Sequence, residues 1–153
     1  MMRWTIPLFA LLSFTPSCGF PEPNALMRAV ESQDPQKVQS LLDSGADPDD
    51  GGLGTPLVEA ARSGDVDILR ILMRGGAKID FDDGVGWTAL VAAGWAGSES
   101  AAKFLVDSGA NVCIRTTSEI DWAPNMYASE VASTAGYNDL SRYLRDRQSR
   151  CPR

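Results

Sequence analysis

Apolar residues recur along this chain at helical spacing, in short blocks that are interrupted by glycine. The segment GTPLVEAARSGDVDILRILMRGGA, residues 54–77, has one such block before Gly64 and a wider one after it. Apolar positions three and four residues apart lie on one face of a helix. Gly64 favours a break between the blocks. The pattern therefore predicts two short helices that are joined by a tight turn.

The same helix pair recurs along the chain. Four matches share one displacement: Thr55 with Thr88, Gly64 with Gly97, Leu72 with Leu105, and Gly76 with Gly109. An upstream copy matches Leu41 with Leu72 at a slightly shorter displacement, and a downstream copy matches Leu105 with Leu144 at a longer one. A period of about 33 residues is the signature of stacked repeats. We predict four repeats, at about residues 24–50, 51–83, 84–115 and 122–147.

The residues at the helix ends support this division. Each second helix is expected to begin at a residue whose side chain can cap backbone amides. The predicted caps are Asp34, Asp65, Ser98 and Asn138. Glycines 45, 76 and 109 follow the last apolar positions, where a left-handed helix stop is expected. Turn-rich segments such as DPDDGGLG and DFDDGVG predict hairpin-like loops between the repeats.

The Gly-x-Thr-(Pro/Ala)-Leu openings at Gly54 and Gly86, and the Gly-Ala-(Asp/Lys/Asn) endings, resemble ankyrin repeats over about residues 24–147. The family's common histidine after Thr-Pro-Leu is replaced by Val58 and Val91. That histidine is structural in the family, so its loss leaves the expected fold unchanged. The resemblance implies an all-α ankyrin-repeat solenoid of about four helix-turn-helix repeats with hairpin loops.

The second helices indicate where each repeat lies in the stack. The two middle helices have broad apolar stripes, whereas the first has Lys37 and Ser40 at apolar places and the last has Ser141 and Arg145. Internal repeats bury two flanks, and terminal repeats bury one and keep a polar outer side. We therefore expect a stack that is complete at four repeats.

Residues 1–18 differ from the rest of the chain and predict a signal peptide. Arg3 precedes an apolar run that ends before Thr15. This run is much shorter than the ~20 residues of a spanning helix. A buried N-terminal helix is the weaker alternative, because Pro7 interrupts it. Export favours a periplasmic or secreted protein, with residues 19–23 as a linker.

Cys18 is a candidate for lipidation. The preceding Thr-Pro-Ser resembles a bacterial lipobox, but it lacks the usual leucine and contains a proline. Lipidation of Cys18, which would anchor the protein to the outer membrane, and ordinary cleavage near this position both stay open. Any membrane contact is expected through this anchor alone.

The other two cysteines occupy near-equivalent places after the second helices of neighbouring repeats. Neighbouring repeats lie about 10 Å apart, and flexible flanks can close that distance to the bridging range. We predict a Cys113–Cys151 disulfide that ties the tail, residues 148–153, to the third repeat. Two free thiols are the alternative.

The residue inventory argues against catalysis. The chain of 153 residues has a net charge of −6 and no histidine, which disfavours nucleic-acid binding and removes the commonest base and metal ligand. Gly84-Val85-Gly86 lacks the rest of a dinucleotide motif. Asp80–Gly84 resembles part of a calcium loop, but the twelfth position is Val91 instead of glutamate. We expect no enzyme activity, no cofactor and no metal site.

The family resemblance implies that partners bind at the hairpin tips and at the exposed ends of the first helices. The corresponding candidate residues are Glu31, Arg62, Trp87, Trp95, Trp122 and Met126. Trp95 stands where the previous repeat has Arg62, and both types are enriched in binding hot spots. Trp87 has packing on its neighbouring hairpin as an alternative role. The long loop that carries Trp122 either takes part in binding or is a neutral insertion, and both alternatives stay open.

These expectations favour a non-catalytic protein-binding module of the bacterial cell envelope. Two more specific roles are an immunity protein, which inhibits a secreted toxic effector, and an accessory protein of an envelope stress-defence enzyme. The acidic segments Asp47–Asp50 and Asp80–Asp83 favour a basic protein partner. We expect no nucleic-acid partner, and a monomer when the protein is free.

Overall fold

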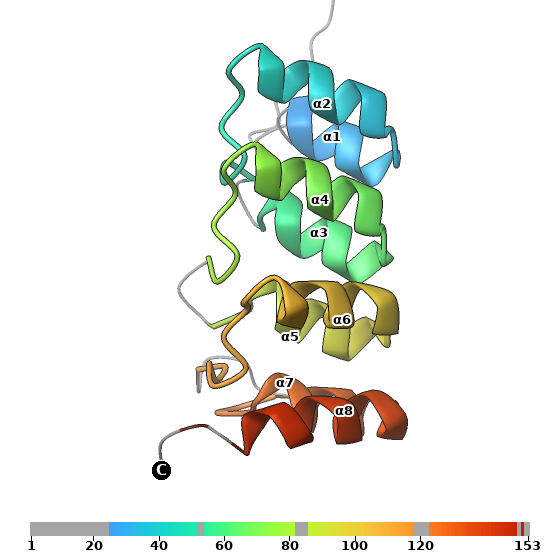
Figure 1. The fold of residues 1–153 in the computed structure, drawn as a ribbon, viewed down its shortest axis with the longest axis vertical. Helices are drawn as coiled ribbons and strands as arrows, with labels where there is room; N and C mark the ends of the chain where they lie inside the picture. The colour runs from blue at the N-terminus through green and yellow to red at the C-terminus, as the bar shows by residue number, and fades with distance from the viewer. Residues whose placement is uncertain (1–24, 52–53, 82–85, 118–122, 150, 152–153) are drawn as a thin grey trace, which may run out of the picture.

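The computed structural model describes residues 25–51, 54–81, 86–117, 123–149 and 151 (Figure 1). Cys18 and Trp122 lie outside these ranges. The helices within them are α1 (Ala25–Glu31), α2 (Pro35–Asp43), α3 (Pro56–Ser63), α4 (Val66–Arg74), α5 (Ala89–Ala96), α6 (Glu99–Asp107), α7 (Ala128–Thr134) and α8 (Asn138–Gln148). Each predicted repeat supplies one helix pair, with α8 ending one residue beyond the predicted limit.

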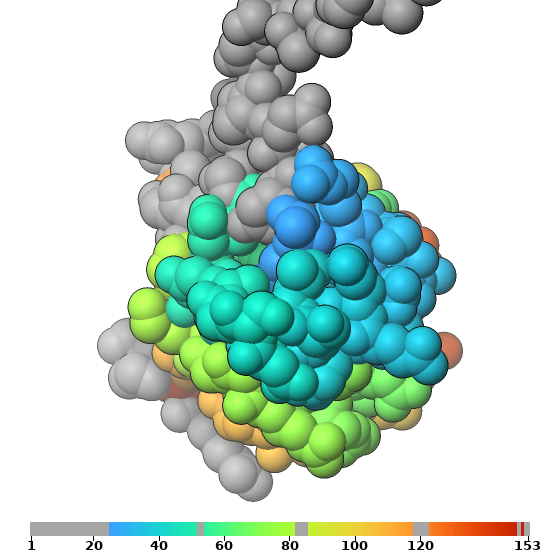
Figure 2. Space-filling view, turned by 90° about the horizontal axis from the view of Figure 1, so that it is seen from above, coloured from blue at the N-terminus to red at the C-terminus, as the bar shows by residue number. Residues whose placement is uncertain are grey.

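The helix pairs stack in chain order, from α1–α2 at one end to α7–α8 at the other (Figure 1). The first helices form one layer, in which α3 contacts α1 and α5, and α5 contacts α7. In the second layer, α4 contacts α2 and α6. Seen from above in Figure 2, the α1–α2 pair covers one end of the stack. This arrangement confirms the predicted all-α repeat solenoid.

Small apolar residues let the first helices approach closely. Ala60 and Ala61 in α3, and Ala92 and Ala93 in α5, have no exposed surface. One close approach is at Gly94, where an added Cβ would lie 2.8 Å from the backbone oxygen of Ala128 in α7. The first helices thus pack with alanine and glycine at the contact, which larger side chains would prevent.

The predicted helix ends are largely present. Asp34 and Asp65 accept hydrogen bonds from the amides of Lys37, at 2.9 Å, and Ile68, at 3.0 Å. The glycines at positions 45, 76 and 109 have φ angles of 90°, 96° and 98°. These are left-handed conformations, in which glycine has no Cβ penalty.

Two of the predicted caps behave differently. Asn138 was predicted to cap α8, but Tyr137 occupies the cap position and Asn138 is the first helical residue. Ser98 is at the cap position of α6 as predicted, but its hydroxyl makes no capping bond. It donates instead to the backbone oxygen of Arg62 in the previous repeat, at 3.1 Å. A contact between repeats has replaced the local bond.

The end flanks follow the expectation with one exception. Lys37 and Arg145 are exposed, as expected for the outer sides of a complete stack. Ser141 was expected on the polar flank but is only 3% exposed. Its hydroxyl accepts a hydrogen bond from Nη2 of Arg145 at 3.2 Å, so the small polar group is buried with a partner.

The loops between the pairs are not regular β-hairpins in the part of the chain that the structure describes. The isolated antiparallel bridge found there joins Arg115 and Tyr127 in the long loop. Thr116 closes this loop, because its amide donates to the Met126 oxygen at 2.9 Å and its hydroxyl accepts from the Met126 amide at 2.9 Å. Arg115 also stacks on the Tyr127 ring, with its guanidinium carbon 4.0 Å from the ring centre.

Aspartates in these loops connect neighbouring repeats. Oδ1 of Asp49 accepts from the Lys78 amide at 3.0 Å, and Oδ1 of Asp80 accepts from the Asn111 amide at 2.8 Å. The Lys78 ammonium also lies 3.4 Å from Asp49. These two carboxylates therefore fix the position of one loop against the next.

Cations and aromatic rings connect the second helices in the later repeats. Arg70 of α4 lies over the Phe104 ring of α6, 5.1 Å from its centre, and Lys103 of α6 lies 5.6 Å from the centre of the Tyr143 ring of α8. Arg147 lies over the same Tyr143 ring at 3.6 Å. We call the Arg70–Phe104 and Lys103–Tyr143 pairs the outer ladder.

The structure contains the disulfide that the cysteine positions predict. Cys113 and Cys151 are joined, with their Cα atoms 5.6 Å apart. The bond ties the segment after α8 to the loop that follows α6. It therefore fastens the last helix pair to the third repeat.

Replacing both disulfide cysteines, Cys113→Ser with Cys151→Ser, should lower the free energy of unfolding by about 3–4 kcal/mol. In the chain-entropy model, the bond restricts the unfolded chain across a sequence separation of 38 residues. Urea unfolding followed by circular dichroism measures the difference. An unchanged midpoint and slope would contradict a stabilising role.

Asp80→Ala should lower the free energy of unfolding by about 1–2 kcal/mol, because the Asn111 amide loses its carboxylate partner. Asp107→Ala is the matched control, since Asp107 is exposed in the last turn of α6. It should change stability by no more than about 0.5 kcal/mol. Equal effects of the two substitutions would show that the Asp80 bond contributes nothing specific.

Candidate partner-binding surface

The exposed ends of the first helices carry residues at equivalent repeat positions. Glu31 ends α1, Arg62 lies in the last turn of α3, and Trp95 lies in the last turn of α5. Their separations along the chain equal the displacements between the first three repeats. Thr134 ends α7 at the next equivalent position. All four are exposed, and we call them the inner strip.

Trp95 is the most exposed large apolar residue of the described part, with 43% of its surface accessible. Its ring meets the Trp87 ring edge to face, with centroids 6.4 Å apart and an interplanar angle of 65°. Such aromatic pairs are favourable beyond their buried area. The contact therefore favours one orientation of the Trp95 ring, although much of the residue faces solvent.

Trp87 has a supporting role in this pair. It is partly buried and packs against the hydrophobic core. Residues 91 and 95 are four apart and lie along one side of α5, and Trp87 immediately precedes the N-cap, Thr88. Val91, between the two tryptophans, is only 1% exposed. Trp87 therefore packs against the core and also contacts Trp95 of the candidate surface.

Arg62 is held by its own helix. Nε and Nη2 donate to the two carboxylate oxygens of Glu59, at 2.8 and 2.5 Å. The hydrogen bond and the charge of Glu59 raise the pKa of Arg62 above its ordinary value. Since 51% of the Arg62 side chain remains accessible, its fixed guanidinium can still meet a partner. Glu59 offsets part of its charge.

Tyr137 was not among the predicted site residues. It is 42% exposed, and its ring covers Gly97, where an added Cβ would lie 2.3 Å from the ring. Gly97 ends α5, two positions after Trp95, with a left-handed φ of 69°. The usable sequence signal was that Tyr137 aligns with Ser98 of the third repeat, at a place where the other repeats have small capping residues.

The remaining predicted residues lie in the long loop. Met126 aligns with Trp87 at the displacement of the last repeat, so it occupies the equivalent position. It is half-buried and packs against the core, and its backbone is bonded to Thr116. Trp122 lies outside the described residues. The structure thus brings together Glu31, Arg62, Trp95 and Trp87 along neighbouring repeats, and it leaves the role of Met126 as a prediction.

Metal sites and membrane-spanning helices were also considered within the described ranges. Within them, no group of three or more Cys, Asp or Glu side chains is arranged to hold a metal ion. In the same part of the chain, no helix has the length and apolar character needed to cross a membrane.

Comparisons with known proteins agree with this architecture. A family model described as ankyrin repeats (3 copies) matches residues 26–116, which contain the first three helix pairs except for Ala25, the first residue of α1. Ankyrin repeat and SAM domain-containing protein 6 of Mus musculus is 33% identical over 91 residues, which are 59% of this chain and 9% of that protein. Protein PhlB of Serratia liquefaciens is 41% identical over 92 residues, 58% of this chain and 40% of that protein.

Calmodulin-binding transcription activator CBT of Oryza sativa subsp. japonica is 32% identical over 79 residues, 52% of this chain and 8% of that protein. The matched part is therefore less than half the length of each of these relatives. The family model, in contrast, covers more than half of the 153 residues. The chain belongs to the ankyrin-repeat family, whose repeats are protein-binding modules.

Proposed function

We propose that this protein is a non-catalytic protein-binding module of the bacterial cell envelope, which holds one partner protein on the inner strip and Trp87. The observation that carries the proposal is the exposed Trp95 ring, which the Trp87 ring contacts edge to face. Tryptophan and arginine are enriched among residues that dominate binding energies. A ring that is already oriented loses less conformational freedom when a partner binds.

The charges along the inner strip constrain the partner. Glu31 and the Glu59–Arg62 pair belong to the first two repeats, whereas α5, which carries Trp95, has no charged residue. A matching surface would place an apolar or aromatic group on Trp95 and polar groups beside Arg62. Asp49 and Asp80 bind amides of the neighbouring loops, so they are less available to attract a basic partner.

The envelope location is supported by the disulfide and by the N-terminal segment. Disulfides persist in oxidising compartments such as the bacterial periplasm and are rare in the cytosol. The Cys113–Cys151 bond is consistent with export, which the predicted signal peptide of residues 1–18 would direct. We propose lipidation of Cys18 as the means of anchoring. Inhibition of a toxic effector and support of a stress-defence enzyme would both use the same surface.

Site-specific photo-crosslinking in intact cells of the source organism tests this proposal. A photoreactive residue at Arg62 should give an adduct with one envelope protein, whereas the same residue at Arg142 on α8 should not. Mass spectrometry of the adduct identifies the partner, and an effector or a defence enzyme would separate the two roles. The same adduct from both positions, or none from Arg62, would contradict the proposed surface.

Trp95→Ala should then weaken the purified complex about 30-fold or more, as expected for loss of a hot-spot residue. Arg142→Ala is the matched control, because Arg142 is exposed on an outer helix. It should leave the dissociation constant unchanged in calorimetry. Circular dichroism establishes that both variants are folded. Equal affinities of Trp95→Ala and the native protein would remove Trp95 from the site.

A further inference from the structure

The loops of neighbouring repeats are linked at one recurring position, and the last of these links is the disulfide. Asp49 and Asp80 are repeat equivalents, and each accepts a hydrogen bond from a backbone amide of the next loop. Cys113 is the equivalent residue of the third repeat. It is bonded to Cys151, which lies one position beyond the place that aligns with Asn111, the amide donor to Asp80. A covalent bond thus replaces the carboxylate–amide bond in the last interval.

The two ends of the disulfide belong to different parts of the stack. The Cys113 amide donates to Oδ1 of Asn111 at 2.9 Å, and the Asn111 amide donates to Asp80 at 2.8 Å. At the other end, the Cys151 amide donates at 2.9 Å to the oxygen of Gln148, the last residue of α8. The disulfide therefore connects the end of α8 to a loop that is itself bound to the second repeat.

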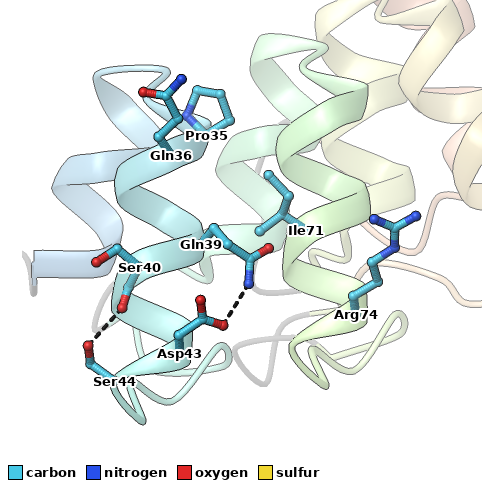
Figure 3. A pocket seen from close by; sticks show the side chains of 8 residues that line it. All are labelled: Pro35, Gln36, Gln39, Ser40, Asp43, Ser44, Ile71 and Arg74. Atoms are coloured by element: carbon cyan, nitrogen blue, oxygen red, sulfur yellow. Dashed lines mark hydrogen bonds between the residues drawn. The ribbon is translucent and has the colours of Figure 1, made fainter.

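Helix α8 packs less closely in the layer of second helices than the others do. Helices α2 and α4 lie side by side, and Ile71 of α4 extends toward α2 beside the groove in Figure 3. Helix α4 also packs on α6, whereas α8 packs on α7 without comparable packing on α6. The outer-ladder pair Lys103–Tyr143 joins α8 to α6, but a cation–π pair at an exposed site contributes little. The disulfide is therefore a main attachment of α8 to the third repeat.

Both cysteines can be reached by a reductant, because both are partly exposed. A thiolate of an external dithiol attacks one sulfur and forms a mixed disulfide, which the second thiol of the dithiol then resolves. The dithiol is oxidised by two electrons, and its two protons end on the thiols of Cys113 and Cys151. The bonds of Asp49 and Asp80 are unaffected by this chemistry, so it opens the last link alone.

We propose that the Cys113–Cys151 bond is a redox-controlled latch, which holds α8 on the third repeat when oxidised and releases α8 when a dithiol reduces it. Elements with few packing contacts open locally while the rest of a protein stays folded, and each repeat of a stack contacts only its neighbours. Release of α8 also removes the Tyr137 ring from Gly97, which ends α5 two positions after Trp95. The latch itself does not depend on the proposed function.

Amide hydrogen exchange of the full chain, measured by NMR, tests the latch. The chain carries Cys18→Ser, so that Cys113 and Cys151 are its remaining cysteines, and dithiothreitol without denaturant is the reductant. Reduction should speed exchange in α8 at least about tenfold and leave α1–α4 protected, because only the last link is opened. The indole signal of Trp95 should shift. Unchanged exchange in α8, equal acceleration in all helices, or reduction that requires denaturant would overturn the proposal.

The double variant Cys113→Ser with Cys151→Ser is the matched control, since it lacks the bond under all conditions. Its α8 amides should exchange as fast as those of the reduced protein, and dithiothreitol should have no further effect on it. Slow exchange in α8 of this variant would show that the disulfide is not what holds the helix. Faster exchange in α8 without a shift of the Trp95 signal would overturn the connection to the inner strip.

Discussion

The structure depends on one constraint, which is that no helix pair can bury its apolar surface without a neighbour. Helix α5 shows this most clearly, because six of its eight residues are buried and none is charged. It lies between α3 and α7 and contacts both. Alanine and glycine at these contacts allow close approach, as at Gly94 and Ala128. Stacking therefore fixes both the order of the repeats and the alignment of their equivalent positions.

Because the repeats are aligned, residues that recur at the repeat spacing in the sequence lie next to one another on the surface. Residues one repeat apart come to lie in rows, so Glu31, Arg62 and Trp95 share the inner strip although they belong to three different repeats. The rows tolerate different side chains because they are exposed, whereas the buried rows do not. Function can thus be placed on the scaffold without altering what stabilises it.

The fold could be predicted because its determinants repeat within the sequence. Glycines at positive φ and leucines without exposed surface recur at the repeat spacing, and each has a local reason. The bonds between repeats could not be predicted in the same way. The Asp80 contact with the Asn111 amide depends on how neighbouring loops are aligned in space. Ser98 has a good capping side chain, yet it binds Arg62 of the previous repeat because that oxygen lies within reach.

In the candidate site, too, the positions of residues could be predicted from the repeat, whereas the contacts between their side chains could not. The position of Trp95 at an exposed helix end follows from the repeat, but its contact with Trp87 depends on ring orientations that spacing does not specify. Tyr137 was missed because its place normally holds a small capping residue, and only the structure shows its ring on Gly97. This contact gives the last repeat a part in the candidate surface. Tyr137 belongs to the α7–α8 pair, and the disulfide fastens that pair to the third repeat. Through Tyr137 and Gly97, the pair that the disulfide fastens therefore contacts the C-terminal end of α5, the helix that carries Trp95.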